Sequence, residues 1–137
     1  MLQRASEVRP DNPLLRRGDP KKDRDHRIIG DPWIMRQGDV WEMYYFGFDG
    51  QHARECLATS SDLVHWKKSP LNPIMDAGPP GTYDSIHCHK PCIILHDGVY
   101  YHFYTACGPR PDGSEHRAIG LAMSRKLPGV RYRLGLN

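Results

Sequence analysis

The sequence has few cysteines, no long apolar run and no large excess of charge of either sign. Its four cysteines in 137 residues fall far below the density of disulfide-stapled secreted domains, and none of them forms a Cys-x-x-Cys pair. Nineteen basic and sixteen acidic residues leave a formal net charge of +3. These shortages predict one ordinary soluble domain with reduced thiols.

Apolar stretches are short throughout the chain. Residues 92–95 (CIIL) form one of the longest, whereas a membrane-spanning helix needs roughly 20 apolar residues, so a transmembrane segment is excluded. Residues 1–7 lack the apolar core of a signal peptide. We therefore expect a cytoplasmic protein, with an already removed leader as the open alternative.

The basic residues do not form a nucleic-acid surface. Six lysines and arginines lie between Arg16 and Arg27, but Asp19, Asp23 and Asp25 are interleaved with them, so the local charge is only +3. A solvated loop is the simpler interpretation, and no nucleic-acid partner is predicted.

An internal repeat is the strongest pattern that is present. Residues 31–35 and 40–45 match residues 90–94 and 99–104 at a constant offset of 59. Thirteen glycines and twelve prolines separate the short apolar runs, as in strands joined by turns. Gly38-Asp39 and Asp97-Gly98 are expected to form hairpin turns, because these residues tolerate positive φ angles.

Each repeat predicts four short strands and so an all-β fold. The expected strands are residues 32–36, 40–46, 55–60 and a weaker one from 66, then 92–96, 99–106, 118–124 and a weaker one from 131. Four-stranded antiparallel sheets with aromatic second strands are typical of β-propeller blades. Blade one is expected at about residues 12–71 and blade two at about 72–137, with residues 30–68 and 89–133 superposing. A β-sandwich whose halves merely share hairpin chemistry is the alternative.

Four stretches of the chain carry a family resemblance. They are residues 12–15 (NPLL), 30–34 (GDPWI), 41–45 (WEMYY) and 57–66 (LATSSDLVHW). With them the sequence resembles, over about residues 12–125, the five-bladed β-propeller glycoside hydrolases, most nearly family 43 and its relatives in families 32, 62, 117 and 130. The resemblance implies a carbohydrate substrate and, in the complete form, inverting hydrolysis of an arabinofuranosyl, xylosyl or related glycosidic bond.

The resemblance also implies where a catalytic carboxylate lies. In the family an aspartate at the start of the first blade's innermost strand acts as general base, and Asp31, followed by Pro32, matches that position. A strand-start aspartate that only satisfies a turn is the alternative. The equivalent position in the second repeat holds Lys90, so Asp84 is the nearest candidate for the second catalytic carboxylate.

The glutamate that protonates the leaving group in this family has no match on an inner strand here. Inverting enzymes hold acid and base about 6.5–9.5 Å apart, so Asp31 cannot serve as both. Family 117 relatives use a histidine as the acid, and we therefore place His89 with Asp31 and Asp84 as a catalytic candidate. His87 and Lys90 are expected to bind sugar hydroxyls. His87 could also replace the missing acid, and for both histidines hydroxyl binding or a simple polar role in the loop is the alternative to acid catalysis.

Two further side-chain types bear on ligands. Trp33, next to the Asp-Pro pair, is expected to stack on a sugar ring. His87, Cys88, His89 and Cys92 carry imidazole and thiolate groups, which are good zinc ligands. In an extended strand, however, Cys88 faces away from both histidines, so the spacing is poor for a zinc site. No metal and no cofactor is predicted.

The predicted function is a carbohydrate-active, glycoside hydrolase-like protein of which the chain forms two blades. Because Lys90 stands where an acid is expected, a non-catalytic glycan-binding or scaffold propeller is the alternative, together with an inactive truncated fragment. Two blades leave sheet faces and edges uncovered, so we also expect self-association rather than a stable monomer.

Overall fold

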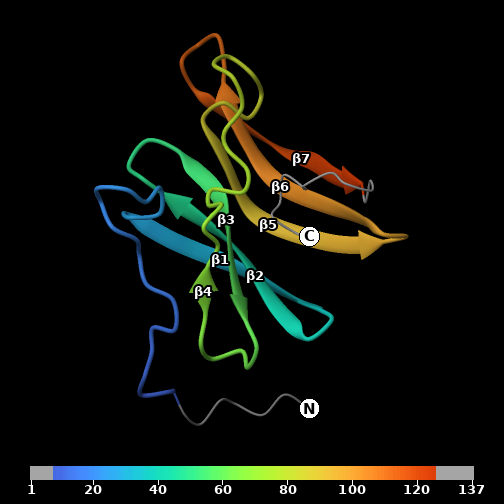
Figure 1. Ribbon diagram of the computed structural model, residues 1–137. Helices are drawn as coiled ribbons and strands as arrows, with labels where there is room; N and C mark the ends of the chain where they lie inside the picture. Colours follow the sequence, from blue (N-terminus) through green and yellow to red (C-terminus); the bar gives the residue numbers. More distant parts are fainter. Residues whose placement is uncertain (1–7, 126–137) are drawn as a thin grey trace.

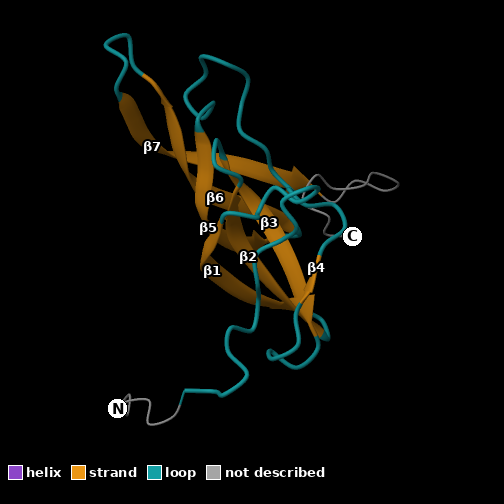
Figure 2. Cartoon of the chain, turned by 90° about the vertical axis from the view of Figure 1, so that its left-hand side faces the viewer, coloured by secondary structure: helices purple, strands orange, loops and turns teal. Residues whose placement is uncertain are grey.

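The computed structural model describes residues 8–125, and all regular structure in this range is β-strand (Figure 2). The first sheet contains β1 (Ile28–Gln37), β2 (Val40–Phe48), β3 (Ala53–Ser60) and β4 (Lys67–Lys68), side by side in chain order. The second sheet contains β5 (His87–His96), β6 (Val99–Pro109) and β7 (Glu115–Arg125). All neighbouring strands pair antiparallel, and the second sheet packs on the first through β5 (Figure 1). The all-β prediction is confirmed.

The inner strands of the two sheets carry the same irregularity at equivalent positions. A β-bulge interrupts the pairing of β1 with β2, and another interrupts the pairing of β5 with β6. Asp31 (φ 50°) lies in the first bulge and Lys90 (φ 60°) in the second. Positive φ is uncommon for residues other than glycine, so its recurrence confirms the register of the repeat.

Both inner hairpins turn where the sequence predicts. Gly38 has φ 59° between β1 and β2, whereas Asp97 and Gly98 have φ 49° and 72° between β5 and β6. Two-residue turns with positive φ match the right-handed twist of the strands that they join. The turns therefore fix which side chains of each hairpin share a face.

The predicted strand bounds need correction. β1 begins at Ile28 and β5 at His87, ahead of the predicted starts at residues 32 and 92. The reason is that each bulge absorbs the X-Pro dipeptide and lets antiparallel pairing continue on its amino-terminal side. β4 has only two residues, and the strand predicted from residue 131 lies outside the described range.

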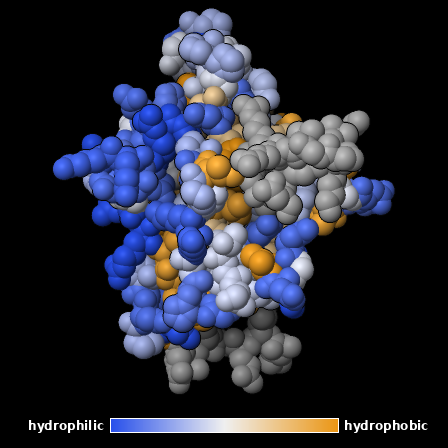
Figure 3. Space-filling view, in the orientation of Figure 1, coloured by the Kyte–Doolittle hydropathy of each residue, from blue (hydrophilic) through white to orange (hydrophobic). Residues whose placement is uncertain are grey.

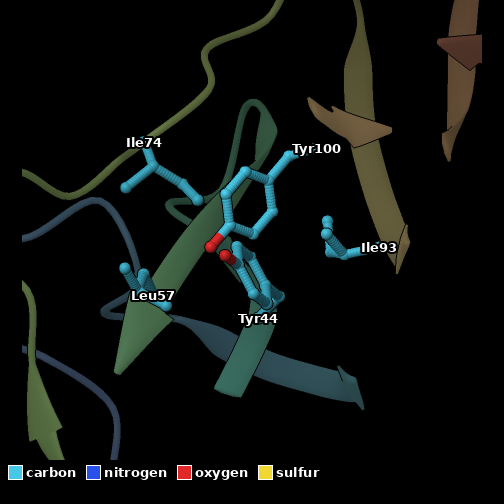
Figure 4. Close-up of a cluster of buried hydrophobic side chains, with 5 residues drawn as sticks. All are labelled: Tyr44, Leu57, Ile74, Ile93 and Tyr100. Carbon is cyan, nitrogen blue, oxygen red and sulfur yellow. The ribbon is translucent and has the colours of Figure 1, made fainter. Parts of the chain in front are cut away.

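The core lies between the two sheets. Its main apolar cluster contains Tyr44 and Leu57 from the first sheet, Ile93 and Tyr100 from the second, and Ile74 from the connecting segment (Figure 4). The hydroxyl ends of the two tyrosines point toward one another in Figure 4. Burial of these large side chains from both sheets stabilises the contact between the blades.

A histidine lies inside this core without polar contacts. His102 is fully buried, and the rings of Tyr44 and Tyr104 meet it edge-on with centroids 6.0 and 6.2 Å away. Burial lowers the pKa of His102 to about 4, so the ring is neutral at pH 7. Neither of its nitrogens has a hydrogen-bond partner among residues 8–125. At this point the blades therefore meet through aromatic ring contacts.

The other face of the second sheet is apolar and exposed. Ile119, Leu121 and Met123 alternate along β7 with exposed fractions of 76%, 45% and 48%, and Ile94 of β5 lies on the same face. On the side of the molecule turned to the viewer, the space-filling view shows scattered apolar patches between hydrophilic areas (Figure 3).

This face predicts self-association. We expect light scattering to report a mass above the 15.7 kDa of one chain. A variant with Ile119→Lys and Met123→Lys should associate less, because charged groups on the face oppose its burial. A monodisperse 15.7 kDa species in the unmodified chain would contradict the prediction.

Candidate functional site

The two bulges place two charged side chains at the same end of the inner strands. Asp31 and Lys90 are both exposed, and within residues 8–125 neither forms an ion pair. A bulge re-aims the side chain that it carries, and a strained positive-φ residue is frequent at binding sites. We call this end of the inner strands the mouth.

Two more predicted site residues lie close to the mouth. His89 is the residue before Lys90, and its pKa responds to the charges of its neighbours. Burial lowers that pKa most, His87, Arg117 and Lys90 lower it further, and Asp31 opposes the shift. The structure therefore brings Asp31, His87, His89 and Lys90 close together, while the role of each stays a prediction.

His89 is nearly buried, with an exposed fraction of 8%. Its Nε2 lies 3.5 Å from Sγ of Cys107, and its ring meets Phe46 of the first sheet edge-on with centroids 5.9 Å apart. Because its pKa is lowered, the ring carries little positive charge at neutral pH. These surroundings argue against proton donation by His89, whose catalytic role stays a prediction.

His87 joins the two sheets. The backbone N–H of Ala53 donates to Nδ1 of His87 at 3.0 Å, and in return Nδ1 of His52 lies 2.8 Å from the carbonyl oxygen of Ile86. Burial lowers the pKa of His87, which keeps the ring neutral. With Nδ1 accepting, the ring proton belongs on Nε2, where it can donate to a sugar oxygen.

Trp33 also connects the sheets. Its indole Nε1–H donates to the carbonyl oxygen of Ile93 at 3.1 Å, while 37% of the residue stays exposed. The hydrogen bond fixes the ring beside the mouth. Sugar stacking by Trp33 stays a prediction.

Asp84 has a different environment from the mouth residues. The Tyr104 hydroxyl donates to one carboxylate oxygen of Asp84 at 2.9 Å, and the Thr82 hydroxyl donates to the other at 3.0 Å. In the first repeat, Tyr45 donates to Asp25 in the same way at 3.0 Å. The recurrence of this pair in both blades indicates that Asp84 anchors its blade, and its catalytic role is untested.

We expect Asp84→Ala to lower the free energy of unfolding by about 1–3 kcal/mol, because the buried Tyr104 hydroxyl loses an acceptor. Asp25→Ala is the counterpart in the first repeat and should cost more, because Asp25 also loses its ion pair with Lys68. Chemical denaturation measures both, and glycan binding of the folded variants should be unchanged. A loss of binding by Asp84→Ala at unchanged stability would instead favour a role in the site.

Glu55 is the residue near the mouth that the sequence did not reveal. It is fully buried on β3, and the charge of Asp31 contributes to its raised pKa. Glu55 belongs to no sequence motif, so its burial near Asp31 could not be predicted from the sequence and becomes visible only in the packed structure. The described part of the chain contains no group of three or more His, Cys, Asp or Glu side chains placed to hold a metal ion.

An ion-pair cluster supports the loop beside the mouth. The guanidinium of Arg54 lies 2.6 Å from both Asp49 and Asp76. Burial opposes ionisation of Asp49, but hydrogen bonds from the backbone N–H groups of His52 and Gln51 and the contact with Arg54 lower its pKa overall. The cluster holds residues 49–53, and with them the N–H group that orients His87.

Comparisons with known proteins agree with this architecture. No family model matches the sequence. Among solved structures, a "Glycoside hydrolase" shares 31% identity with a TM-score of 0.68, covering 92% of this chain and 34% of its own. BT0996, described as an RGII complex, shares 32% identity with a TM-score of 0.65, covering 90% and 34%. Zg3597, a family 117 glycoside hydrolase of Zobellia galactanivorans, shares 19% identity with a TM-score of 0.65, covering 80% and 32%.

The fold and the repeated bulges define a pair of β-propeller blades. The chain has the fold of the five-bladed propeller glycoside hydrolases of the family 43, 117 and 32 type, which confirms the resemblance predicted from its sequence. It spans about a third of the length of the solved structures compared above.

Proposed function

We propose that this chain provides two blades of a glycoside hydrolase and that the mouth binds a carbohydrate. The support is the 31% identity to a glycoside hydrolase over 92% of the chain. A second similar structure is described as a complex with RGII, a carbohydrate. The observation that carries the proposal is the exposed Asp31, re-aimed by a positive-φ bulge at the mouth.

In this proposal Asp31 is the general base of an inverting hydrolysis. Its exposed carboxylate can accept a proton from a water that attacks the anomeric carbon. Lys90 and the Nε2–H of His87 donate to sugar oxygens on the second-blade side. Trp33 supplies apolar surface to the ring. An arabinofuranosyl or xylosyl bond is the proposed substrate, and cytoplasmic localisation stays a prediction.

A non-catalytic glycan-binding protein is the second candidate. The observation that favours it is Lys90 in the bulge equivalent to that of Asp31, because a lysine there supplies charge and hydrogen bonds but no second carboxylate. The low exposure of His89 also leaves no well-placed acid among the mouth residues named above.

One pair of assays, made on the complete propeller that contains these two blades, separates the two functions. Calorimetric titration with arabinose and xylose oligosaccharides measures binding, and release of nitrophenol from nitrophenyl arabinofuranosides and xylosides measures turnover. Binding together with turnover supports the hydrolase. Binding without turnover supports the glycan-binding protein, and absence of both would contradict each of them.

A further inference from the structure

Glu55 is a buried carboxyl group without a polar partner. Its exposed fraction is 0%, and neither of its carboxyl oxygens has a hydrogen-bond partner within the described part of the chain. Glu42, the other buried glutamate of the sheet, differs because the Tyr44 hydroxyl donates to it at 3.1 Å. Of the two, only Glu55 has a carboxyl group without a polar partner among the described residues.

The backbone of Glu55 is held on both sides. Its N–H donates to the carbonyl oxygen of Met75 at 3.1 Å, and its own carbonyl oxygen accepts from the N–H of Ile74 at 2.9 Å. On the other side it pairs with Phe46 of β2, which in turn pairs with Gly30, the neighbour of Asp31. The backbone of Glu55 is therefore fixed two strands away from the first bulge.

The side chain of Glu55 lies on the face that the second sheet covers. Directly paired residues of antiparallel strands share a face, and Glu55 shares that of Phe46, whose ring meets His89 of β5. It also lies near enough to the Cys88 thiol on β5 for a negative charge on Glu55 to raise the pKa of that thiol. Glu55 thus lies between the Asp31 bulge and the start of the second blade.

The surroundings favour the protonated form of Glu55. Burial raises its pKa well above the usual value, and the charge of Asp31 on β1 raises it further. Two thiols whose pKa responds to Glu55 are those of Cys56 on its own strand and Cys88 on β5, and burial raises the pKa of each to about 12, so both are uncharged. His89, which contacts Phe46, has a lowered pKa and carries little charge at neutral pH. Phe46 and Met75, whose backbones pair with Glu55 from β2 and the connecting segment, do not titrate.

We propose that Glu55 is a positioning residue of the mouth: it holds a proton at neutral pH, so that Asp31 faces no second negative charge from inside the blade. Full burial prevents Glu55 from touching a sugar, so it is not the missing acid. When one of two nearby carboxyl groups is buried and the other exposed, the buried group keeps its proton and the exposed group ionises. Here the buried group is Glu55 and the exposed group is Asp31. This inference rests on the proposed function in one respect, the assignment of Asp31 as the general base.

Infrared spectroscopy of the whole chain tests the proposal, because a protonated carboxyl group has a C=O stretching band that an ionised carboxylate lacks. The band of Glu55 is identified by subtracting the spectrum of the Glu55→Gln variant from the spectrum of the unmodified chain. We expect this band at pH 7 and its loss at higher pH. With Asp31→Asn the midpoint of that loss should fall by roughly one pH unit, because a nearby negative charge has been removed.

Asp39→Asn is the matched control, since Asp39 is an exposed aspartate at the opposite end of the same hairpin. It should leave the midpoint unchanged. If Glu55→Gln does not fold, direct comparison of the unmodified chain with Asp31→Asn gives the same shift. Absence of the band at pH 7, or an equal midpoint with and without the Asp31 charge, would overturn the proposal. Neither result depends on turnover, so failure of the hydrolase assignment would be seen separately.

Discussion

Asp31→Asn is expected to lower the kcat of a glycosidase preparation containing these blades by roughly 100-fold or more, the usual scale for loss of a general base. Asparagine keeps the shape of the side chain but cannot accept the proton of the attacking water. Because Asp31 is exposed in the bulge, the substitution should not disturb folding, and a lower kcat can be attributed to the lost carboxylate. Steady-state kinetics with an aryl arabinofuranoside or xyloside measures the effect.

Binding provides the control for this result. Asp31→Asn should keep its glycan affinity, because the sugar contacts proposed for Lys90, His87 and Trp33 are unchanged, and Asp39→Asn should change neither kcat nor affinity. Turnover that survives Asp31→Asn at its original rate would remove Asp31 from catalysis and return attention to Asp84 and His89.

Arg54→Met is expected to reduce the free energy of unfolding by about 3–5 kcal/mol, the usual cost of breaking a buried ion pair by removing one partner. Methionine replaces much of the arginine stem but leaves Asp49, whose side chain is only 7% exposed, without its closest cation. Chemical denaturation at neutral pH measures the loss. The variant should also weaken glycan binding, because residues 49–53 orient His87.

Arg24→Met tests the same carboxylate from its exposed side. Arg24 lies 3.6 Å from Asp49, but its side chain is 63% exposed, so the expected cost is below about 1 kcal/mol. Equal costs for the two substitutions would mean that the burial of Arg54 contributes nothing. The two arginines share Asp49 as a partner, but Arg54 lies closer to it, is more buried and also pairs with Asp76.

The parts of the site that sequence can predict are those carried by the repeat. The 59-residue offset alone predicts equivalent positions for Asp31 and Lys90, and both occur in matching bulges. The extension of β1 and β5 ahead of these positions is not predictable in the same way, since a bulge changes strand pairing without leaving a mark in hydrophobic alternation.

The sequence by itself determined the all-β class, the hairpin turns and the register of the two blades, because side-chain alternation, turn residues and repeat spacing are local properties. Only the tertiary structure decided which polar side chains face a partner. Asp84 acquires its tyrosine hydrogen bond, His89 its burial and Glu55 its isolation from strands distant in sequence. Burial and charge proximity set protonation, and both arise only when the sheets pack together.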